Sequence, residues 1–239
     1  MKKTLLALCV FVSIGVQAQN LPQLGKDPIN KIVAAMTLEE KATLLVGYQV
    51  SNAEANIIAT AAGTTAPIER FGIPSTYMVD GPSGVRVDTI IPGTDKRRYC
   101  TGFPTATLLA STWDTEVLEK VGEAMGDELV EYGYDVLLAP ALNIQRNPLC
   151  GRNFEYYSED SVLSSAMACY EVKGIEKNGV FVVYKHFALN DCEQDRIGLG
   201  VWLNEQAARE IYLKAFQAPI EEADAGVMTA YTRWGATWS

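Results

Sequence analysis

The feature that most constrains the fold is a repeated alternation of short apolar segments with segments of helical periodicity. Four apolar segments are predicted to be strands, at residues 75–79, 136–139, 180–184 and 226–229. Continuous apolar strands separated by helices are typical of a parallel sheet that is buried on both faces. The sequence therefore predicts an α/β fold, either a doubly wound sheet or a (β/α)8 barrel of the TIM type.

Local signals place helices between these strands and ahead of the first one. Thr37 and Glu40 fit a capping box, Gly133 and Asn204 fit the end and the start of two helices, and Pro219 is expected to disturb a helix end. Helices are predicted within residues 26–47, as two short ones, and at 115–132, 160–177 and 205–217, with helix plus loop over 51–69.

The spacing of the strands sets the size of the complete domain. They recur roughly every 50 residues, so an eight-stranded barrel would need roughly 180 residues more than this chain of 239 contains. We therefore expect about the N-terminal half of a barrel, truncated at its C-terminus. A complete four-stranded α/β domain is the alternative, but its last parallel strand would lack a crossover helix.

The first 18 residues have the pattern of an export signal. Lys2 and Lys3 precede a short apolar run over residues 4–15, and residues 16–18 form a small-residue cleavage site. The run is too short to span a bilayer, and no other stretch is long enough. We expect a signal peptide at 1–18, a barrel domain over 19–239, and a protein that is exported to the periplasm or the exterior.

Charge and composition argue against several classes of function. The 20 basic and 29 acidic residues give a net charge of −9, which is unfavourable for nucleic-acid binding. The run Lys96–Arg98 is interpreted as a solvated turn. No G-x-G-x-x-G follows the first strand, and no G-x-S-x-G occurs. With one histidine and no C-x-x-C pair, we expect neither a metal nor a cofactor.

Polar side chains gather where the predicted strands end. Asp80, the pair Lys185 and His186, and Tyr231 each follow a strand, which in barrels is the active-site face. Arg86 and Arg152 lie in nearby loops. Simpler interpretations exist: Asp80 as a turn residue, Arg152 in an ion pair with Glu155, and His186 as a core group. Together the charged groups suit hydrogen bonding to a neutral polyhydroxylated ligand, and the aromatic groups suit stacking on a sugar.

Six segments resemble, in order, motifs of glycoside hydrolase family 3, the β-glucosidase family. They are residues 80–86 (DGPSGVR), 103–105 (FPT), 138–148 (LAPALNIQRNP), 151–155 (GRNFE), 185–188 (KHFA) and 227–231 (VMTAY). The resemblance implies a TIM-type barrel followed by an α/β sandwich, and cleavage of terminal β-linked sugars with retention of configuration. It implies a β-linked glucoside or oligosaccharide as the ligand. It assigns substrate-binding roles to Asp80, Arg86, Arg152, Lys185, His186, Met228 and Tyr231.

The resemblance also implies residues that this sequence does not contain. The family's nucleophile lies in a Ser/Thr-Asp-Trp/Tyr motif beyond the 227–231 segment, and its acid/base Glu lies later still. We therefore nominate no catalytic residue and expect these residues alone to be inactive. Asp191, Glu193 and Asp195 are interpreted as loop structure.

Some alternatives stay open on the sequence alone. A non-catalytic sugar-binding protein of the same fold and a β-xylosidase are the other candidate functions, and the sequence does not indicate an oligomeric state. Four cysteines follow the predicted signal and allow three complete pairings. A disulfide between Cys150 and Cys192, in two loops of the predicted site, is one possibility.

Overall fold

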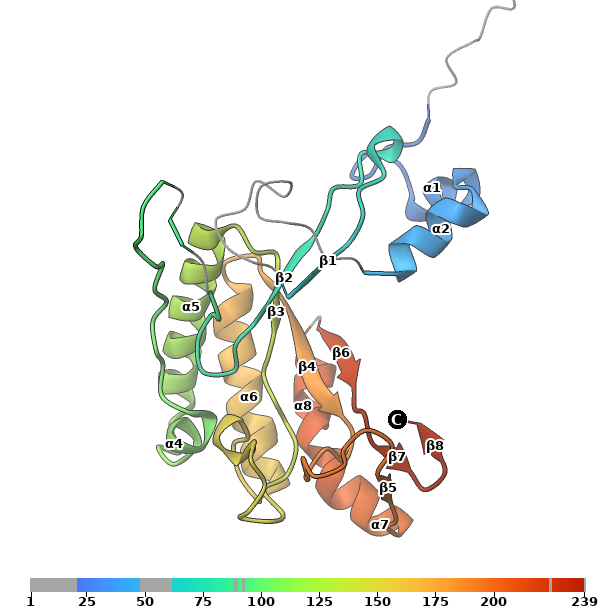
Figure 1. The fold of residues 1–239 in the computed structure, drawn as a ribbon. Helices are drawn as coiled ribbons and strands as arrows, with labels where there is room; N and C mark the ends of the chain where they lie inside the picture. Colours follow the sequence, from blue (N-terminus) through green and yellow to red (C-terminus); the bar gives the residue numbers. More distant parts are fainter. Residues whose placement is uncertain (1–20, 48–61, 88–89, 92, 224, 239) are drawn as a thin grey trace, which may run out of the picture.

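The computed structural model describes residues 21–47, 62–87, 90–91, 93–223 and 225–238. Its main element is a curved five-stranded sheet (Figure 1). The strand order follows the chain: β1 (Gly63–Thr64), β2 (Tyr77–Asp80), β3 (Val136–Leu138), β4 (Phe181–Phe187) and β6 (Gly226–Thr229). β1 is antiparallel to β2, and the other four strands are parallel. All four predicted strands are therefore present.

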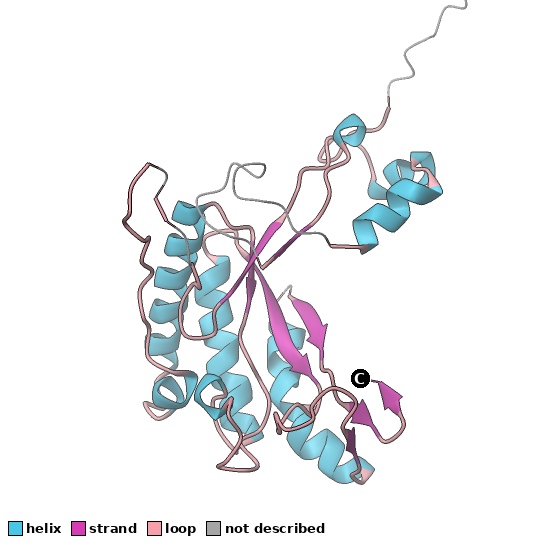
Figure 2. Ribbon diagram, in the orientation of Figure 1, coloured by secondary structure: helices cyan, strands magenta, loops and turns pink. Residues whose placement is uncertain are grey.

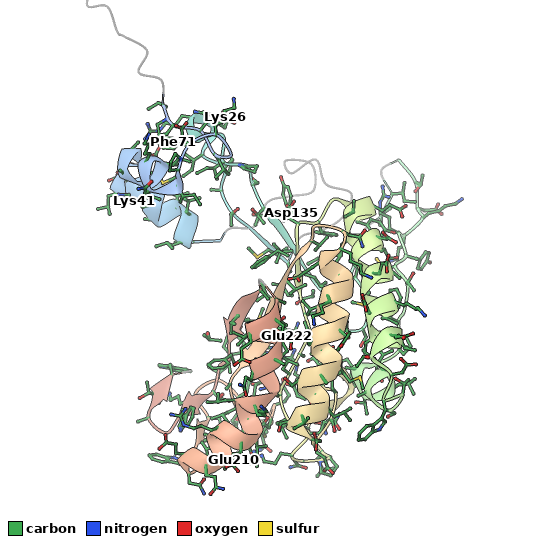
Figure 3. The ribbon with its side chains drawn as sticks, turned by 180° about the vertical axis from the view of Figure 1, so that it is seen from behind. Lys26, Lys41, Phe71, Asp135, Glu210 and Glu222 are labelled. Atoms are coloured by element: carbon green, nitrogen blue, oxygen red, sulfur yellow. The ribbon has the colours of Figure 1, made fainter. Side chains whose placement is uncertain are left out.

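The helices that connect the parallel strands lie on one face of the sheet. Figure 2 and the reverse view in Figure 3 both show this single helical layer. It contains α5 (Thr115–Tyr132), α6 (Ser161–Glu176) and α8 (Lys214–Glu222), with the short α4 (Ala106–Ala110) at one end. A doubly wound sheet reverses its strand order and carries helices on both faces. In a (β/α) barrel the strands follow one another in chain order and all the helices lie on the outer face. Four parallel strands are half of such a barrel.

The core lies between this helical layer and the sheet. Leu118, Met125 and Leu129 of α5 are fully buried, as are Val172 and Ile175 of α6. These side chains recur every three or four residues, which is the spacing that puts them on one side of a helix. As the sequence predicts, α5 ends at Gly133, which has a left-handed backbone conformation with a φ of 78°.

A small N-terminal unit is set apart from the barrel strands (Figure 1). It consists of α1 (Ile29–Ala35), α2 (Leu38–Leu45) and a 3-10 turn, η1 (Glu69–Phe71). The predicted capping box at the start of α2 is present, with Thr37 and Glu40 bonding each other's backbone amides. Ile32, Met36, Ile68 and Phe71 form a separate apolar cluster that joins these elements.

The predicted helix at 205–217 is wrong in its form and its end. It begins after the Asn204 cap as α7 (Glu205–Ala207), widens into a π-helical turn, η3 (Ala208–Tyr212), and resumes as α8. Pro219 lies inside α8 instead of ending it. Pro219 is buried, and its carbonyl accepts a hydrogen bond from the Tyr184 hydroxyl of β4 at 3.0 Å, which holds this part of α8 against the sheet.

Other elements were not predicted, and some predictions cannot be compared with the structure. A second sheet contains β5 (Gly200–Val201), β7 (Arg233–Trp234) and β8 (Thr237–Trp238), and residues 153–155 form a 3-10 turn, η2 (Asn153–Glu155). The predicted signal at 1–18 and most of the predicted helix within 51–69 lie outside the described residues, and residues 63–64 form β1, not helix. No helix in the described part of the chain has the length and hydropathy needed to cross a membrane.

Candidate functional site

A cavity of about 770 Å³ opens at the carboxyl ends of the parallel strands. Four of the seven predicted binding residues line it: Asp80, Arg86, Arg152 and Lys185. Asp80 ends β2, Arg86 lies in the next loop, Arg152 precedes η2, and Lys185 is on β4. Chain segments that are about a hundred residues apart therefore meet at the edge where barrel sites form.

The loop that carries Asp80 and Arg86 is closed on itself and packed against a second loop. The Arg86 amide donates to the Asp80 carbonyl at 2.8 Å, and the Phe103 amide donates to the Ser83 carbonyl at 3.2 Å. Gly84 has a φ of 117°, and a Cβ at this position would lie 2.4 Å from the Thr101 carbonyl oxygen. Only glycine fits here, so the DGPSGVR segment is shaped to bring two loops together.

Lys185 is fixed by its backbone and is almost fully buried. Its amide donates to the Pro140 carbonyl at 3.0 Å, and its carbonyl accepts from the Leu142 amide at 2.7 Å. Its Nζ lies 3.5 Å from Oδ1 of Asp80, and the two side chains are 5% and 41% exposed. Burial lowers the pKa of Lys185, and the Glu155 and Asp80 carboxylates oppose this shift.

Hydrogen bonds to Asn143 determine the tautomer of His186. The His186 amide donates to Asn143 Oδ1 at 3.0 Å, and Asn143 Nδ2 donates to the His186 carbonyl at 3.0 Å. Because Oδ1 is thereby an acceptor, His186 Nδ1, at 3.2 Å from it, carries the hydrogen and Nε2 is left as an acceptor. Burial, followed by the charges of Arg152, Lys185 and Arg196, lowers the pKa of His186 to about 2, so the ring is neutral.

Arg152 belongs to a network of charges along the cavity wall. Its Nε is paired with Glu155 Oε1, which is the ion pair considered from the sequence, and its Nη1 lies 3.9 Å from Glu193 Oε1. Glu193 also pairs with Arg196 at 2.9 Å. Arg152, Glu155, Glu193 and Arg196 are thus held in place by one another, and fixed charged groups suit directional hydrogen bonds to hydroxyl groups.

The other three predicted residues, His186, Met228 and Tyr231, do not line the cavity. His186 is buried directly after Lys185. Tyr231 is exposed, and the Arg196 guanidinium lies 5.1 Å from the centre of its ring, which links it to the cavity wall. Met228 is half-buried on β6.

Sequence reasoning missed several residues of the wall. Arg98, interpreted as part of a solvated turn, is half-buried and lines the cavity. Glu193, interpreted as loop structure, lines it too, as does Arg196. The contact between Glu193 and Arg152 joins two loops that are distant in sequence, so no local pattern reveals it. The Asn-x-x-Glu-x-x-Arg spacing of residues 190–196 is the signal that could have found Glu193 and Arg196.

The suggested disulfide is wrong for this structure, in which Cys150 and Cys192 are free thiols. Cys192 Sγ instead lies 3.9 Å from the Gln194 carbonyl oxygen. Across the described ranges, no group of three or more His, Cys, Asp or Glu side chains is arranged to hold a metal ion.

A parallel sheet wound in chain order, with a charged cavity at its carboxyl edge, defines the chain as part of a TIM-type barrel domain. The family model described as "Glycosyl hydrolase family 3 N terminal domain" matches residues 42–237. The chain belongs to glycoside hydrolase family 3, as its motifs predict.

Named relatives support this placement. The chain is 42% identical over 209 residues to thermostable β-glucosidase B of Acetivibrio thermocellus, covering 86% of this chain and 26% of that protein. It is 40% identical over 218 residues to a probable β-glucosidase I of Emericella nidulans, covering 91% and 24%. The chain thus spans about a quarter of the length of these curated relatives.

A solved structure is similar over the same region. β-Glucosidase 3B of Thermotoga neapolitana, in complex with α-D-glucose, superposes with a TM-score of 0.83 at 44% identity. The match covers 89% of this chain and 30% of that one.

Proposed function

We propose that the protein containing these residues is a retaining, exo-acting β-glucosidase that releases terminal β-D-glucosyl residues. The observation that carries the proposal is the cavity that collects Asp80, Arg86, Arg152 and Lys185 at the carboxyl edge of a barrel sheet. Relatives that bear the name β-glucosidase, at about 40% identity, support the same activity.

Each predicted residue has a role that fits its surroundings. Asp80 accepts hydrogen bonds from the outer hydroxyls of the sugar, and Lys185, in contact with Asp80, donates to a middle one. The neutral His186 accepts a hydrogen bond from a sugar hydroxyl at Nε2, because its Nδ1–H donates to Asn143 Oδ1. Arg86 and Arg152 bind further hydroxyls from the cavity wall. Tyr231 lies beside the nucleophile, and Met228 lines the pocket of the complete domain.

We also propose that the two catalytic carboxylates are not among these residues. A retaining glycosidase needs a free carboxylate as nucleophile and a second carboxyl group as acid/base, about 5 Å apart. Glu155 and Glu193 are paired with arginines. Burial raises the pKa of Asp191 to about 6, but this side chain is 1% exposed and accepts a hydrogen bond from the Ile144 amide, away from the cavity wall. These residues alone then bind the sugar without cleaving it.

The activity is tested on the full-length protein with chromogenic β-glucoside, β-xyloside, N-acetyl-β-glucosaminide and α-glucoside. The expected result is highest kcat/KM on the β-glucoside, with the β-anomer of glucose as first product by NMR. A preference for the β-xyloside would make the protein a β-xylosidase. Glucose binding without turnover would make it a sugar-binding protein.

The same assay addresses the 239-residue chain, for which we expect no turnover; rates like those of the full-length protein would contradict this.

We further propose that residues 1–18 direct export. Fractionation of the source cells should find the protein outside the cytoplasm, with an N-terminus at Gln19. A cytoplasmic protein that retains Met1 would contradict export.

A further inference from the structure

One carboxylate in the cavity wall contacts two arginines through separate oxygen atoms. Glu193 Oε2 accepts from Arg196 Nη1 at 2.9 Å, and Glu193 Oε1 lies 3.9 Å from Arg152 Nη1. The two arginines come from loops on either side of β4, so Glu193 is the acid that joins them. Without it, two guanidinium groups and the buried Lys185 ammonium would face one cavity with less opposing charge.

The position of Glu193 is set from inside the protein. Asn190 Nδ2 donates to Glu193 Oε1 at 2.9 Å. Asn190 is itself buried, and its carbonyl accepts from the hydroxyl of the fully buried Tyr156 at 3.0 Å. Because Asn190 already restricts the Glu193 side chain, this carboxylate loses less side-chain entropy on pairing with an arginine than a freely rotating, exposed glutamate does. Its contacts are therefore well defined.

The contacts of Glu193 lead to two predicted sugar-binding residues. Arg152 is held between Glu155 and Glu193, which restricts its guanidinium from two sides. Arg196 lies with its guanidinium 5.1 Å from the ring centre of Tyr231, which follows β6. Glu193 thus connects Arg152 with Tyr231 through Arg196.

We propose that Glu193 is a positioning residue for sugar binding, acting through Arg152 directly and through Arg196 on Tyr231. The inference rests on the proposed β-glucosidase function and adds to it a residue that does not itself hold the sugar. A glutamine at 193 has one oxygen acceptor and no charge, so it can serve only one of the two arginines. The other guanidinium would then lose the orientation that the sugar requires.

The test uses the full-length protein and the Glu193→Gln variant, which preserves side-chain shape. We expect KM for a p-nitrophenyl β-glucoside and Ki for glucose to rise about tenfold or more, with kcat within about threefold of wild type, since lost uniform binding raises KM alone. For Glu193→Asp, which keeps the charge, KM and Ki should lie between those of wild type and those of Glu193→Gln. Glu205→Gln on α7, which removes an exposed ion pair with Arg209 of η3, is the matched control.

A double-mutant cycle with Arg196→Met adds a second readout. If Glu193 acts through this arginine, the double variant should be little worse than the poorer single variant, so the effects on Ki are not additive. Fully additive effects would overturn the route through Arg196.

The outcomes separate the inference from the function it rests on. A wild-type protein that cleaves no β-glucoside contradicts the proposed function. An active wild type whose Glu193→Gln variant keeps KM and Ki within about twofold overturns the positioning role, even where that variant has a lower Tm.

Discussion

Nζ of Lys185 on β4 lies 3.5 Å from Oδ1 of Asp80 at the end of β2, although β3 separates the two strands. The pair places a buried cation beside a carboxylate that is partly open to the cavity. Because burial lowers the pKa of Lys185 and Asp80 counters that shift, the carboxylate helps to keep the ammonium protonated.

The first prediction concerns Asp80→Asn in the full-length protein. Without the carboxylate, the pKa of Lys185 falls further, and the alkaline limb of kcat/KM for a β-glucoside should move to lower pH. KM should also rise about tenfold or more, because a charged acceptor for sugar hydroxyls is lost. Asp95→Asn, at an exposed loop position, is the control. An unchanged alkaline limb would mean that Lys185 does not titrate in this range.

The second prediction concerns the contact between α5 and α6. A Cβ at Gly122 would lie 2.0 Å from the Glu171 carbonyl oxygen, and one at Gly174 would lie 2.1 Å from that of Glu119. The helices must separate to admit a methyl group, so Gly122→Ala should destabilise the protein by about 1–3 kcal/mol despite the better helix propensity of alanine. Gly63→Ala, where no atom lies within 4 Å, should leave the Tm unchanged. A Gly122→Ala variant with the wild-type Tm would contradict the close packing.

The fold could be predicted where a local pattern repeats. The bounds of β6 and α5 agree with the prediction, because the apolar pattern lies within each segment and Gly133 directly follows the last residue of α5. The π-helical turn at Ala208–Tyr212 could not be predicted, because it inserts one residue into an otherwise regular helical pattern.

Prediction of the site succeeded for residues at strand ends and failed for their partners. Asp80 and Lys185 were predicted because the active-site residues of barrels lie at the carboxyl ends of the strands. Asn143 was not assigned a role, since its hydrogen bonds reach His186 across 43 residues and arise only when β3 and β4 pair. Arg98 was interpreted wrongly because a three-residue basic run resembles an exposed turn, whereas in the folded chain this side chain is half-buried in the cavity wall.

The third prediction concerns the buried acid Glu171 on α6. The Tyr157 hydroxyl donates to its Oε2 at 2.5 Å, while Oε1 has no hydrogen-bond partner among the described residues. Burial raises the pKa of Glu171 to about 7 from an ordinary value of 4.5. At this residue the folded state therefore binds more protons than the unfolded state between these values, and the stability that Glu171 contributes falls as pH rises through this window, by up to about 3 kcal/mol.

Urea unfolding at several pH values tests this. Between pH 4.5 and 7, the stability of wild type should fall relative to that of Glu171→Gln, which carries no titratable proton at this position. The neutral His186 contributes a rise below pH 6.5 to both proteins, so the difference between them isolates Glu171. Asp191, whose pKa burial raises to about 6, contributes a loss of the same sign to both proteins. Glu131→Gln, on the exposed side of α5, is the control and should follow wild type. Equal slopes for wild type and Glu171→Gln would contradict the prediction.

The last prediction concerns the charge of His186. With a pKa lowered to about 2, chiefly by burial, the folded state binds fewer protons than the unfolded state below the ordinary value of 6.5. The stability that this neutral ring contributes is full above pH 6.5 and is lost as pH falls toward 2. NMR of protein labelled at histidine Cε1 measures the titration, with the His186 signal identified by its absence in His186→Gln. That signal should stay constant from pH 4 to 8 in the folded protein and titrate near pH 6.5 in urea. A folded-state midpoint near 6 would show that the ring is charged in acid, and it would remove the basis for assigning Nε2 as the acceptor of a sugar hydroxyl.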